Sequence, residues 1–226
     1  MVAAIRPRRD GGFIAGLERG FCLLNDRFAV TETVTLLDCP GRAHERRGLR
    51  SPGPVLVRLD DLTPGAGALS LFDPAGGVVE AIAGISCSNA LAWTRDGTRG
   101  YYVDSLTGRV DVLQLGPDGG IAERRQFVDV TGEGFLDGIA VDLADGVWLA
   151  LFGSGLLLHF DGRGRRDAEI AVPVRQVTAC TFAGPDYSEL YITTSRFGLT
   201  DPEAPAGAVF RTKPDVGGFA PYAFGG

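Results

Sequence analysis

The 226-residue sequence contains almost no lysine, because only Lys213 among its 22 basic residues is a lysine. Acidic residues outnumber basic ones by 28 to 22, and the net charge is −6. This balance gives no overall attraction for nucleic acid or for an anionic membrane surface, so we expect neither as a partner. The strong preference for arginine also indicates a gene rich in G and C.

Long hydrophobic runs, a signal peptide and paired cysteines are also missing. No apolar run approaches the roughly 18 residues of a membrane span. The arginines near the N-terminus follow a very short apolar stretch, the reverse of a secretory signal. Cys22, Cys39, Cys87 and Cys180 form no CxxC pair, which argues against a zinc ribbon or a disulfide framework. We expect a cytoplasmic protein with scattered, buried thiols.

Helical periodicity is scarce, whereas a repeat typical of β-structure is present. Four segments share a glycine, alternating apolar residues and a Gly/Asp/Pro turn; they begin at residues 67, 108, 155 and 207, which are 41, 47 and 52 residues apart. A looser copy begins at residue 20. Between them lies a second hairpin type with a DG or PD turn, over residues 91–104, 139–151 and 180–193.

Two hairpins in each repeat make four strands, and four-stranded units recurring every 40 to 50 residues are typical of a β-propeller. We therefore predict an all-β chain that forms one propeller domain over residues 1–226. About five blades' worth of repeats fit into the sequence.

The start of the innermost strand of each blade is the predicted place for chemistry, because these positions converge on the central channel. The aligned positions hold Asn89, Asp137 and Thr178, three side chains that carry oxygen. Hard cations such as calcium bind oxygen ligands, and a carboxylate beside a metal can act as a general base. The alternative is that Asn89 and Asp137 initiate turns by bonding their own backbone.

Other residue patterns give weaker indications of a site. Ser154 lacks the spacing of a nucleophile elbow, and His44 and His159 lack a metal-ligand spacing. Since His159 alternates with apolar neighbours, we predict that it lies on the surface of an outer strand.

The sequence resembles the regucalcin/gluconolactonase family of senescence marker proteins, which also includes luciferin-regenerating-enzyme-like proteins. The resemblance is carried by N-A-L-A-W-T-R-D-G from residue 89, Y-Y-V-D-S from 101, D-G-I-A-V-D from 137, V-W-L-A from 147, P-V-R-Q-V-T-A-C-T-F-A-G-P-D from 173, L-Y-I-T-T from 190 and P-A-G-A-V-F from 205. It is dense over residues 65–226 and weaker over residues 8–38.

This resemblance implies a six-bladed propeller that holds one divalent cation, Ca²⁺ or Zn²⁺, in its channel. It also implies hydrolysis of sugar lactones through metal-bound water. Asn89 and Asp137 match two metal ligands of the family, and Asp137 also matches the proposed catalytic proton-transfer residue. The substrate-binding residues of this chain stay unknown.

The sequence departs from the family pattern at two places. A Glu-Gly-Pro segment that supplies an acidic metal ligand does not precede Gly11, so we expect the N-terminal blade segment to be missing. Residues 42–59 read R-A-H-E-R-R-G-L-R-S-P-G-P-V-L-V-R-L, where the family has its substrate-binding hairpin. This segment contains no inner-hairpin turn.

Residues 43–60 are a suspected frameshifted segment. Permitted synonymous codons for residues 44–61, read one nucleotide out of frame, give T-N-D-G-A-C-D-P-Q-G-R-F-W-F-G-S-M, which matches the family motif. The alternative is a genuine, divergent arginine-rich loop. Because of both departures, we expect the protein with this sequence to be a sugar lactonase whose activity is impaired. The competing hypothesis is a non-catalytic propeller that serves as a binding or scaffold protein and binds metal weakly.

Overall fold

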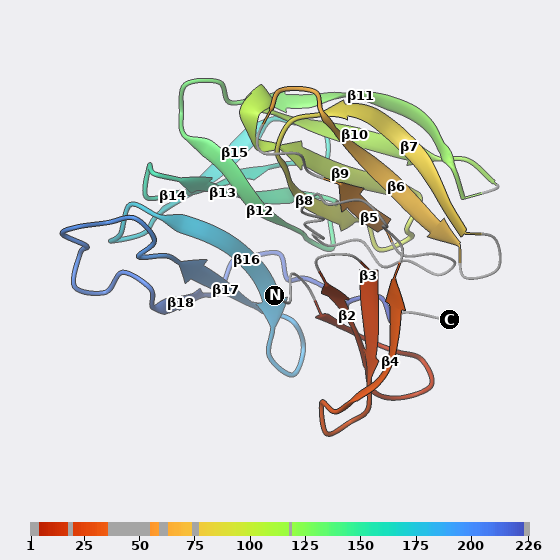
Figure 1. Cartoon of the computed structure of the whole chain (residues 1–226). Coiled ribbons are helices and arrows are strands. Elements are labelled where there is room, and N and C mark those ends of the chain that lie inside the picture. The colour runs from red at the N-terminus through yellow and green to blue at the C-terminus, as the bar shows by residue number, and fades with distance from the viewer. Residues whose placement is uncertain are drawn as a thin grey trace. The chain divides into compact units, whose positions relative to one another are not determined.

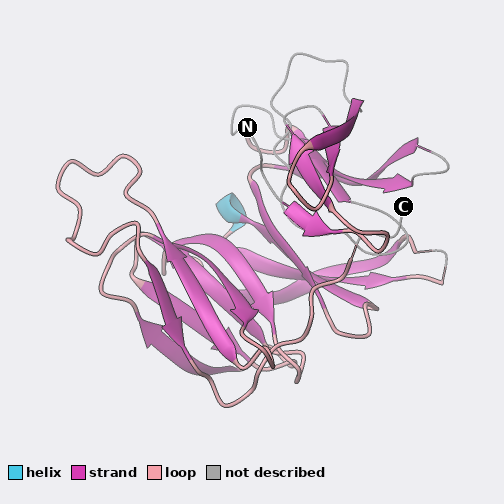
Figure 2. Cartoon of the chain, turned by 90° about the horizontal axis from the view of Figure 1, so that it is seen from below, coloured by secondary structure: helices cyan, strands magenta, loops and turns pink. Residues whose placement is uncertain are grey.

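The structure is a computed structural model, which describes residues 5–17, 20–35, 55–58, 63–73, 77–117 and 119–223. The described residues form strands and one short 3-10 helix, η1 (Ser105–Thr107), drawn in cyan in Figure 2. The prediction of an all-β chain is therefore confirmed. No helix within these ranges is long and apolar enough to cross a membrane.

The strands form five antiparallel sheets that follow one another along the chain (Figure 1). The first sheet consists of β1 (Ile5–Pro7), β2 (Phe13–Leu17), β3 (Gly20–Leu24) and β4 (Val30–Thr35). The second consists of β5 (Val55–Arg58), β6 (Gly67–Asp73) and β7 (Gly77–Ile85). The third consists of β8 (Ser88–Trp93), β9 (Arg99–Asp104), β10 (Arg109–Leu115) and β11 (Ile121–Asp129).

The last two sheets complete the series. One consists of β12 (Phe135–Val141), β13 (Val147–Phe152), β14 (Leu156–Phe160) and β15 (Arg166–Ala171). The other consists of β16 (Val177–Ala183), β17 (Glu189–Thr194) and β18 (Val209–Thr212). Both predicted hairpin types are present: the DG or PD turn joins β8–β9, β12–β13 and β16–β17, and the glycine-rich repeat forms β6–β7, β10–β11 and β14–β15.

The chain divides into two compact units, which are described separately. The first comprises residues 1–88, 115–121 and 221–226, and the second comprises residues 89–114 and 122–220. In the first unit, Val55 pairs with Leu71 and Arg58 with Ala68, so β5 is a strand inside the suspected frameshifted segment. The remainder of residues 43–60 lies outside the described residues, and the frameshift stays a prediction, as does the single domain.

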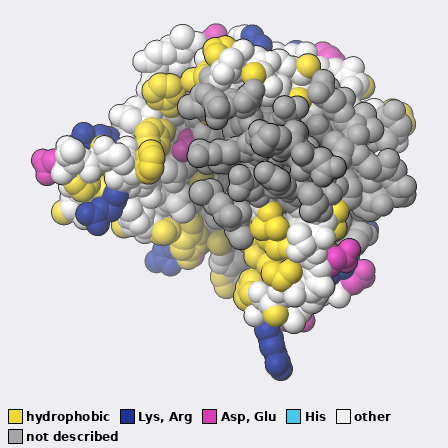
Figure 3. Space-filling view, in the orientation of Figure 1, with side chains coloured by type: hydrophobic (Ala, Val, Ile, Leu, Met, Phe, Trp, Pro, Cys, Tyr) yellow, Lys and Arg dark blue, Asp and Glu magenta, His cyan; other side chains and the backbone are white. Residues whose placement is uncertain are grey.

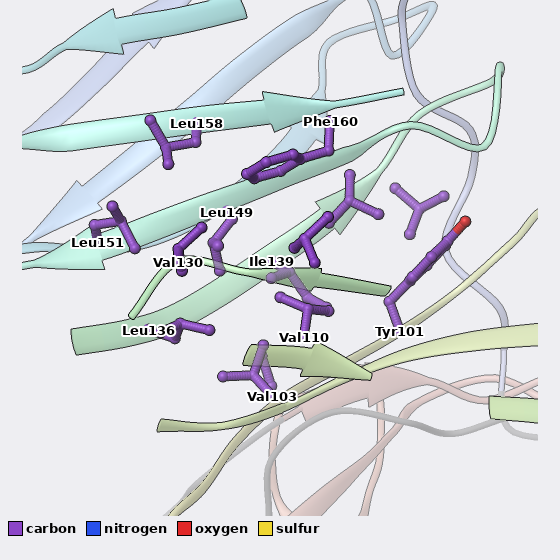
Figure 4. Close-up of a cluster of buried hydrophobic side chains, with 14 of the residues drawn as sticks. Tyr101, Val103, Val110, Val130, Leu136, Ile139, Leu149, Leu151, Leu158 and Phe160 are labelled. Carbon is purple, nitrogen blue, oxygen red and sulfur yellow. The ribbon is translucent and has the colours of Figure 1, made fainter. Parts of the chain in front are cut away.

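The core of the second unit is built from alternating residues of neighbouring strands. Figure 4 shows Tyr101 and Val103 of β9, Val110 of β10, and Leu136 and Ile139 of β12 pointing into one apolar cluster. Leu149, Leu151, Leu158 and Phe160 enter the same cluster from β13 and β14. Because alternate residues of a strand point to opposite faces, this packing fixes the register of the strands and the direction of the side chains between them.

Local hydrogen bonds explain the sharp turn between β12 and β13. The Asp142 carboxylate accepts the backbone N–H groups of Ala144 and Gly146, both at 2.8 Å. Asp145 adopts a positive φ of 62°, a conformation in which Asp is less costly than most residues. The D-G pattern read from the sequence therefore forms the predicted turn.

The cysteines and the charged residues are distributed as follows. Cys22 and Cys180 are buried, and Cys87 is partly buried. The prediction of buried thiols is thus confirmed for two cysteines, and Cys39 lies outside the described residues. On the face drawn in Figure 3, basic side chains are interspersed with acidic ones.

Candidate functional site on three edge strands

Three strands of the second unit, β8, β12 and β16, each form the edge of their sheet. Asn89 lies in β8, Asp137 in β12 and Thr178 in β16. Asn89 and Asp137 thus lie inside strands, and bonding of their side chains to their own backbone stays the competing hypothesis. The repeat alignment predicted equivalent positions, and the structure places all three in the first strand of successive sheets.

Asp137 lies at a β-bulge. The pairing of β12 with β13 shifts between Leu136 and Ile139, so Asp137 and Gly138 are the residues at the irregularity. Bulges redirect side chains and are frequent beside functional sites. The Asp137 residue is 8% exposed, which places a carboxyl group in a largely desolvated position.

Gly138 permits the close approach of β16 to β12. A Cβ atom added at Gly138 would lie 2.5 Å from the Ala179 Cβ and 2.9 Å from the Thr178 carbonyl oxygen. Only a residue without a side chain fits against these atoms. The D-G pair therefore serves strand packing, and it brings Asp137 next to the strand that carries Thr178.

Asn89 is tied to the start of β12 by its amide group. Its Nδ2 donates to the Ser105 Oγ at 2.9 Å and to the Leu136 carbonyl oxygen at 3.3 Å. Ser105 itself donates to the Leu136 carbonyl oxygen at 2.5 Å. Because the NH₂ group of Asn89 is bound to Ser105 and Leu136, the orientation of the amide plane is fixed. The Oδ1 atom of this amide is the one that can bind a metal ion.

Ser105 is the residue of this network that sequence reasoning missed. It begins η1, directly after β9, and is buried. Its hydroxyl accepts from Asn89 and donates to the residue before Asp137. The only sequence signal was its place at the end of the Y-Y-V-D-S motif, which gives no reason to expect a contact with Leu136, 31 residues further along the chain.

Thr178 is the third aligned residue, and it has a different partner. Its Oγ1 lies 2.8 Å from the Oγ1 of Thr193 on the neighbouring strand β17. The pairing of β16 with β17 also shifts between Val177 and Ala179, so Thr178 lies at a bulge as Asp137 does. The same backbone irregularity thus presents a carboxylate in β12 and a hydroxyl in β16.

His159 corrects one prediction. It lies on β14, the third strand of its sheet, and its side chain is only 12% exposed. Its Nε2 lies 2.9 Å from Asp142 and its Nδ1 lies 2.5 Å from Asp167, while its ring packs against Trp148. Two carboxylate partners make burial of the imidazole favourable, which the alternation in the sequence did not reveal.

These contacts change the acidity of His159. Burial by itself lowers the pKa of His159, but the hydrogen bonds that its ring donates to the Asp142 and Asp167 carboxylates outweigh burial, and the net pKa lies above its usual value. Each ring nitrogen of His159 thus has a carboxylate as its partner. His159 has a structural role, and it is not a catalytic base or a metal ligand here.

The remaining sequence candidates do not join the site. The Ser154 hydroxyl donates to the Leu151 carbonyl oxygen at 3.2 Å, and His44 lies outside the described residues. In the part of the chain that the structure describes, no group of three or more His, Cys, Asp or Glu residues could hold a metal ion. The oxygen donors of the site are thus the Asp137 carboxylate, the Asn89 amide and the Thr178 hydroxyl.

This donor set fits a hard divalent cation better than a soft one. Carboxylate and amide oxygens suit calcium, whereas thiolate and imidazole groups are the common ligands of structural zinc. A single carboxylate offsets little of the charge of a divalent ion. We therefore expect weak binding with several water ligands.

A cavity of about 370 Å³ adjoins the Asn89–Ser105 network. Residues 105–108, which connect β9 to β10, form one wall. The other wall consists of residues 131, 132, 134 and 135, at the connection from β11 into β12. The cavity therefore shares Ser105 with the network and lies two residues from Asp137 through Phe135.

Comparison with known proteins gives consistent matches. The family model for the SMP-30/Gluconolactonase/LRE-like region matches residues 1–196. Human regucalcin is 29% identical over 248 residues, an alignment that covers 100% of this chain and 81% of that protein.

Two solved structures share the fold. Regucalcin from Agrobacterium tumefaciens, described as a calcium-binding protein, is 26% identical with a TM-score of 0.87, and the match covers 99% of this chain and 79% of that one. A luciferin-regenerating enzyme is 24% identical with a TM-score of 0.86, over 100% of this chain and 82% of that one. The chain therefore has the fold of a six-bladed β-propeller protein.

Proposed function

This chain belongs to the SMP-30/gluconolactonase/LRE-like family, and from this premise we propose that it is a metal-dependent hydrolase of sugar lactones. The proposal depends on one observation, the link between the edge strands that carry Asn89 and Asp137. The Asn89 amide and the Ser105 hydroxyl both donate to the carbonyl oxygen of Leu136, the residue before Asp137. This link supports the Asn89 amide and the buried Asp137 carboxylate as two ligands of one cation. The A. tumefaciens relative is described as calcium-binding, which supports the choice of ion.

Asp137 acts as the general base in this proposal. Its carboxylate accepts a proton from water while the water oxygen bonds to the lactone carbonyl carbon. The bond between this carbon and the ring oxygen then breaks, the ring oxygen gains a proton, and a hydroxy acid results.

Asn89 and Asp137 would hold the cation, with Thr178 as a further oxygen donor. When bound, a divalent cation supplies a Lewis acid that polarises the lactone carbonyl and makes attack easier. Ser105 orients Asn89 by accepting from its Nδ2. Ser105 is a positioning residue, since its hydroxyl also binds the Leu136 carbonyl.

Lactone hydrolysis with and without metal tests the proposal. D-glucono-δ-lactone and an arabinonolactone are supplied with Ca²⁺ or Zn²⁺, proton release is recorded, and EDTA is added. We expect metal-dependent release that Asp137→Asn lowers by about 100-fold or more, since general base catalysis contributes about 10² to 10⁴. Asp186→Asn, which changes an exposed carboxylate in the β16–β17 turn, is the matched control and should change the rate less than two-fold.

A non-catalytic binding or scaffold role is the second candidate. It is favoured by the absence, within the described ranges, of a cluster of three or more acidic, His or Cys metal ligands. A folded protein that hydrolyses neither lactone under any of these metal conditions would support this role. Hydrolysis that survives Asp137→Asn unchanged would instead remove Asp137 from the mechanism.

A further inference from the structure

The cavity beside Ser105 has no charged side chain in its lining. Two of its lining residues, Leu106 and Phe135, are large apolar side chains that are 45% and 59% exposed. Hydroxyl groups of Ser105, Thr107 and Thr131 stand among them. A pocket of this volume with apolar walls and a few polar groups is typical of a small-molecule site.

One hydrogen bond joins the two connections that form the walls of the cavity, and another holds the β9–β10 connection itself. The Val130 N–H donates to the Gly108 carbonyl oxygen at 2.9 Å, and the Thr107 hydroxyl donates to the Asp104 carbonyl oxygen at 2.7 Å. A Cβ atom added at Gly108 would lie 2.4 Å from the Thr131 Oγ1, so the two connections are in close contact. The cavity is therefore formed without a ligand.

The cavity adjoins the hydrogen-bond network of Asn89 through one shared residue, Ser105. Ser105 lines it and also accepts from the Asn89 amide. Phe135 lines it and is the first residue of β12, the strand that carries Asp137. Because two residues of a strand span about 7 Å, a ring whose carbonyl lies at Asp137 would have a substituent of a few carbons within reach of Phe135.

We infer that this cavity binds an apolar, uncharged substituent of the lactone ring, so the substrate class extends to alkyl-substituted lactones. This inference rests on the proposed function, since it assigns the substrate of the same site. Burial of the substituent would cover apolar surface of Leu106 and Phe135, and each buried methylene favours binding by roughly four-fold.

The charged residues near the cavity favour a substituent without charge. The cavity lining contains neither Lys nor Arg, and the neighbouring Asp129 and Glu133 are acidic. A hydrogen bond from the Thr131 N–H holds the pKa of Asp129 below its usual value, so Asp129 stays ionised. Arg166 is already paired with Glu133 at 2.7 Å, and the cavity lining itself offers no cation to a phosphate or carboxylate.

Binding of lactams tests the cavity independently of hydrolysis. 6-Butylpiperidin-2-one and unsubstituted piperidin-2-one resemble a butyl-substituted and a plain δ-lactone, and the enzyme is not expected to open them. Calorimetry with the full chain and Ca²⁺ should show at least ten-fold tighter binding of the butyl compound. Leu106→Ala and Phe135→Ala should each reduce this preference by three-fold or more.

Leu143→Ala is the matched control, because Leu143 is 47% exposed and lies in the β12–β13 turn away from the cavity. It should leave the preference unchanged. Equal binding of both lactams, or a preference that Leu106→Ala and Phe135→Ala do not alter, would overturn the inference.

Rates with the corresponding lactones separate the two proposals. If the inference holds, δ-nonanolactone should have a kcat/KM at least ten-fold above δ-valerolactone, and Phe135→Ala should reduce this ratio. Hydrolysis of D-glucono-δ-lactone with equal lactam binding would reject the cavity and retain the lactonase. Selective lactam binding without hydrolysis of any lactone would reject the lactonase and retain an apolar ligand site.

Discussion

The sheet β12–β15 and the sheet β16–β18 are built to the same plan but differ at three aligned positions. The edge strand carries Asp137 at its bulge in the first sheet and Thr178 in the second. On the third strand, His159 pairs with Trp148 in the first, and Arg211 pairs with Tyr191 in the second. The repeat thus fixes where a side chain lies, and the residue at each position decides whether it can perform chemistry.

The basic residues on the third strands of the two sheets also differ in their partners. His159 contacts Asp142 and Asp167, whereas Arg211 pairs with Glu189 at 3.2 Å. An arginine stays charged at every physiological pH, but a histidine does not. The two sheets should therefore respond differently to pH, although their backbones are similar.

The largest expected effect comes from giving β12 the residue of β16. Asp137→Thr should lower lactone hydrolysis by about 100-fold or more, because the hydroxyl of Thr cannot replace a carboxylate as a general base. Steady-state kinetics with D-glucono-δ-lactone and Ca²⁺ measures this loss. Thr181→Ser on the exposed side of β16 is the control, and a comparable loss there would indicate general damage.

Separating β12 from β16 should have the next largest effect. Gly138→Ala places a methyl group 2.5 Å from the Ala179 Cβ, and overpacking of this kind costs about 1–3 kcal/mol. Urea unfolding should show this loss. Gly162→Ala is the control, because its added Cβ is no closer than 3.4 Å to any atom; equal stability of the two variants would show that β16 can move aside.

Giving β16 the residue of β12 should strengthen metal binding. Thr178→Asp adds a second carboxylate on β16, the strand that packs against β12, and we expect calcium to bind about ten-fold more tightly because acidic ligands set calcium affinity. Calorimetric titration measures the change. Thr181→Asp adds the same charge on the same strand away from the bulge, and an equal gain there would show only a general electrostatic effect.

The smallest effect concerns pH and His159. Its pKa is higher in the folded protein, so the charged imidazole stabilises the fold below the unfolded pKa near 6.5. This contribution is lost as the pH rises through the folded pKa. The free energy of unfolding should therefore fall as the pH rises from the unfolded to the folded pKa. His159→Arg gives β14 the residue type that β18 has at Arg211, and it should make this pH dependence flatter.

Unfolding curves recorded from pH 6 to pH 9 measure this effect. At pH 6, His159→Gln should be less stable than the wild type by about 1 kcal/mol, because it loses a charge-assisted hydrogen bond. Identical pH dependence of the wild type and His159→Gln would show that the charge of His159 does not contribute to stability.

Much of the fold could be predicted because hairpins depend on local sequence. The D-G pattern at residues 145–146 forms the predicted turn through the Asp142 carboxylate, and the strand after this turn places Leu149 and Leu151 in the core. The positions of Asn89 and Asp137 also followed from the repeat alignment. Residues 43–60 had no such pattern, and only β5 within them is described.

The all-β class, the repeated hairpins and the aligned positions of Asn89, Asp137 and Thr178 can be read from local sequence, because they depend on periodicity and turn residues within short windows. The contacts of those residues, in contrast, depend on the packing of the strands. The Ser105 link to Leu136, the enclosure of His159 by Asp142 and Asp167, and the cavity beside Phe135 join residues from different strands and connections. Such contacts depend on how strands pack, which no local pattern encodes.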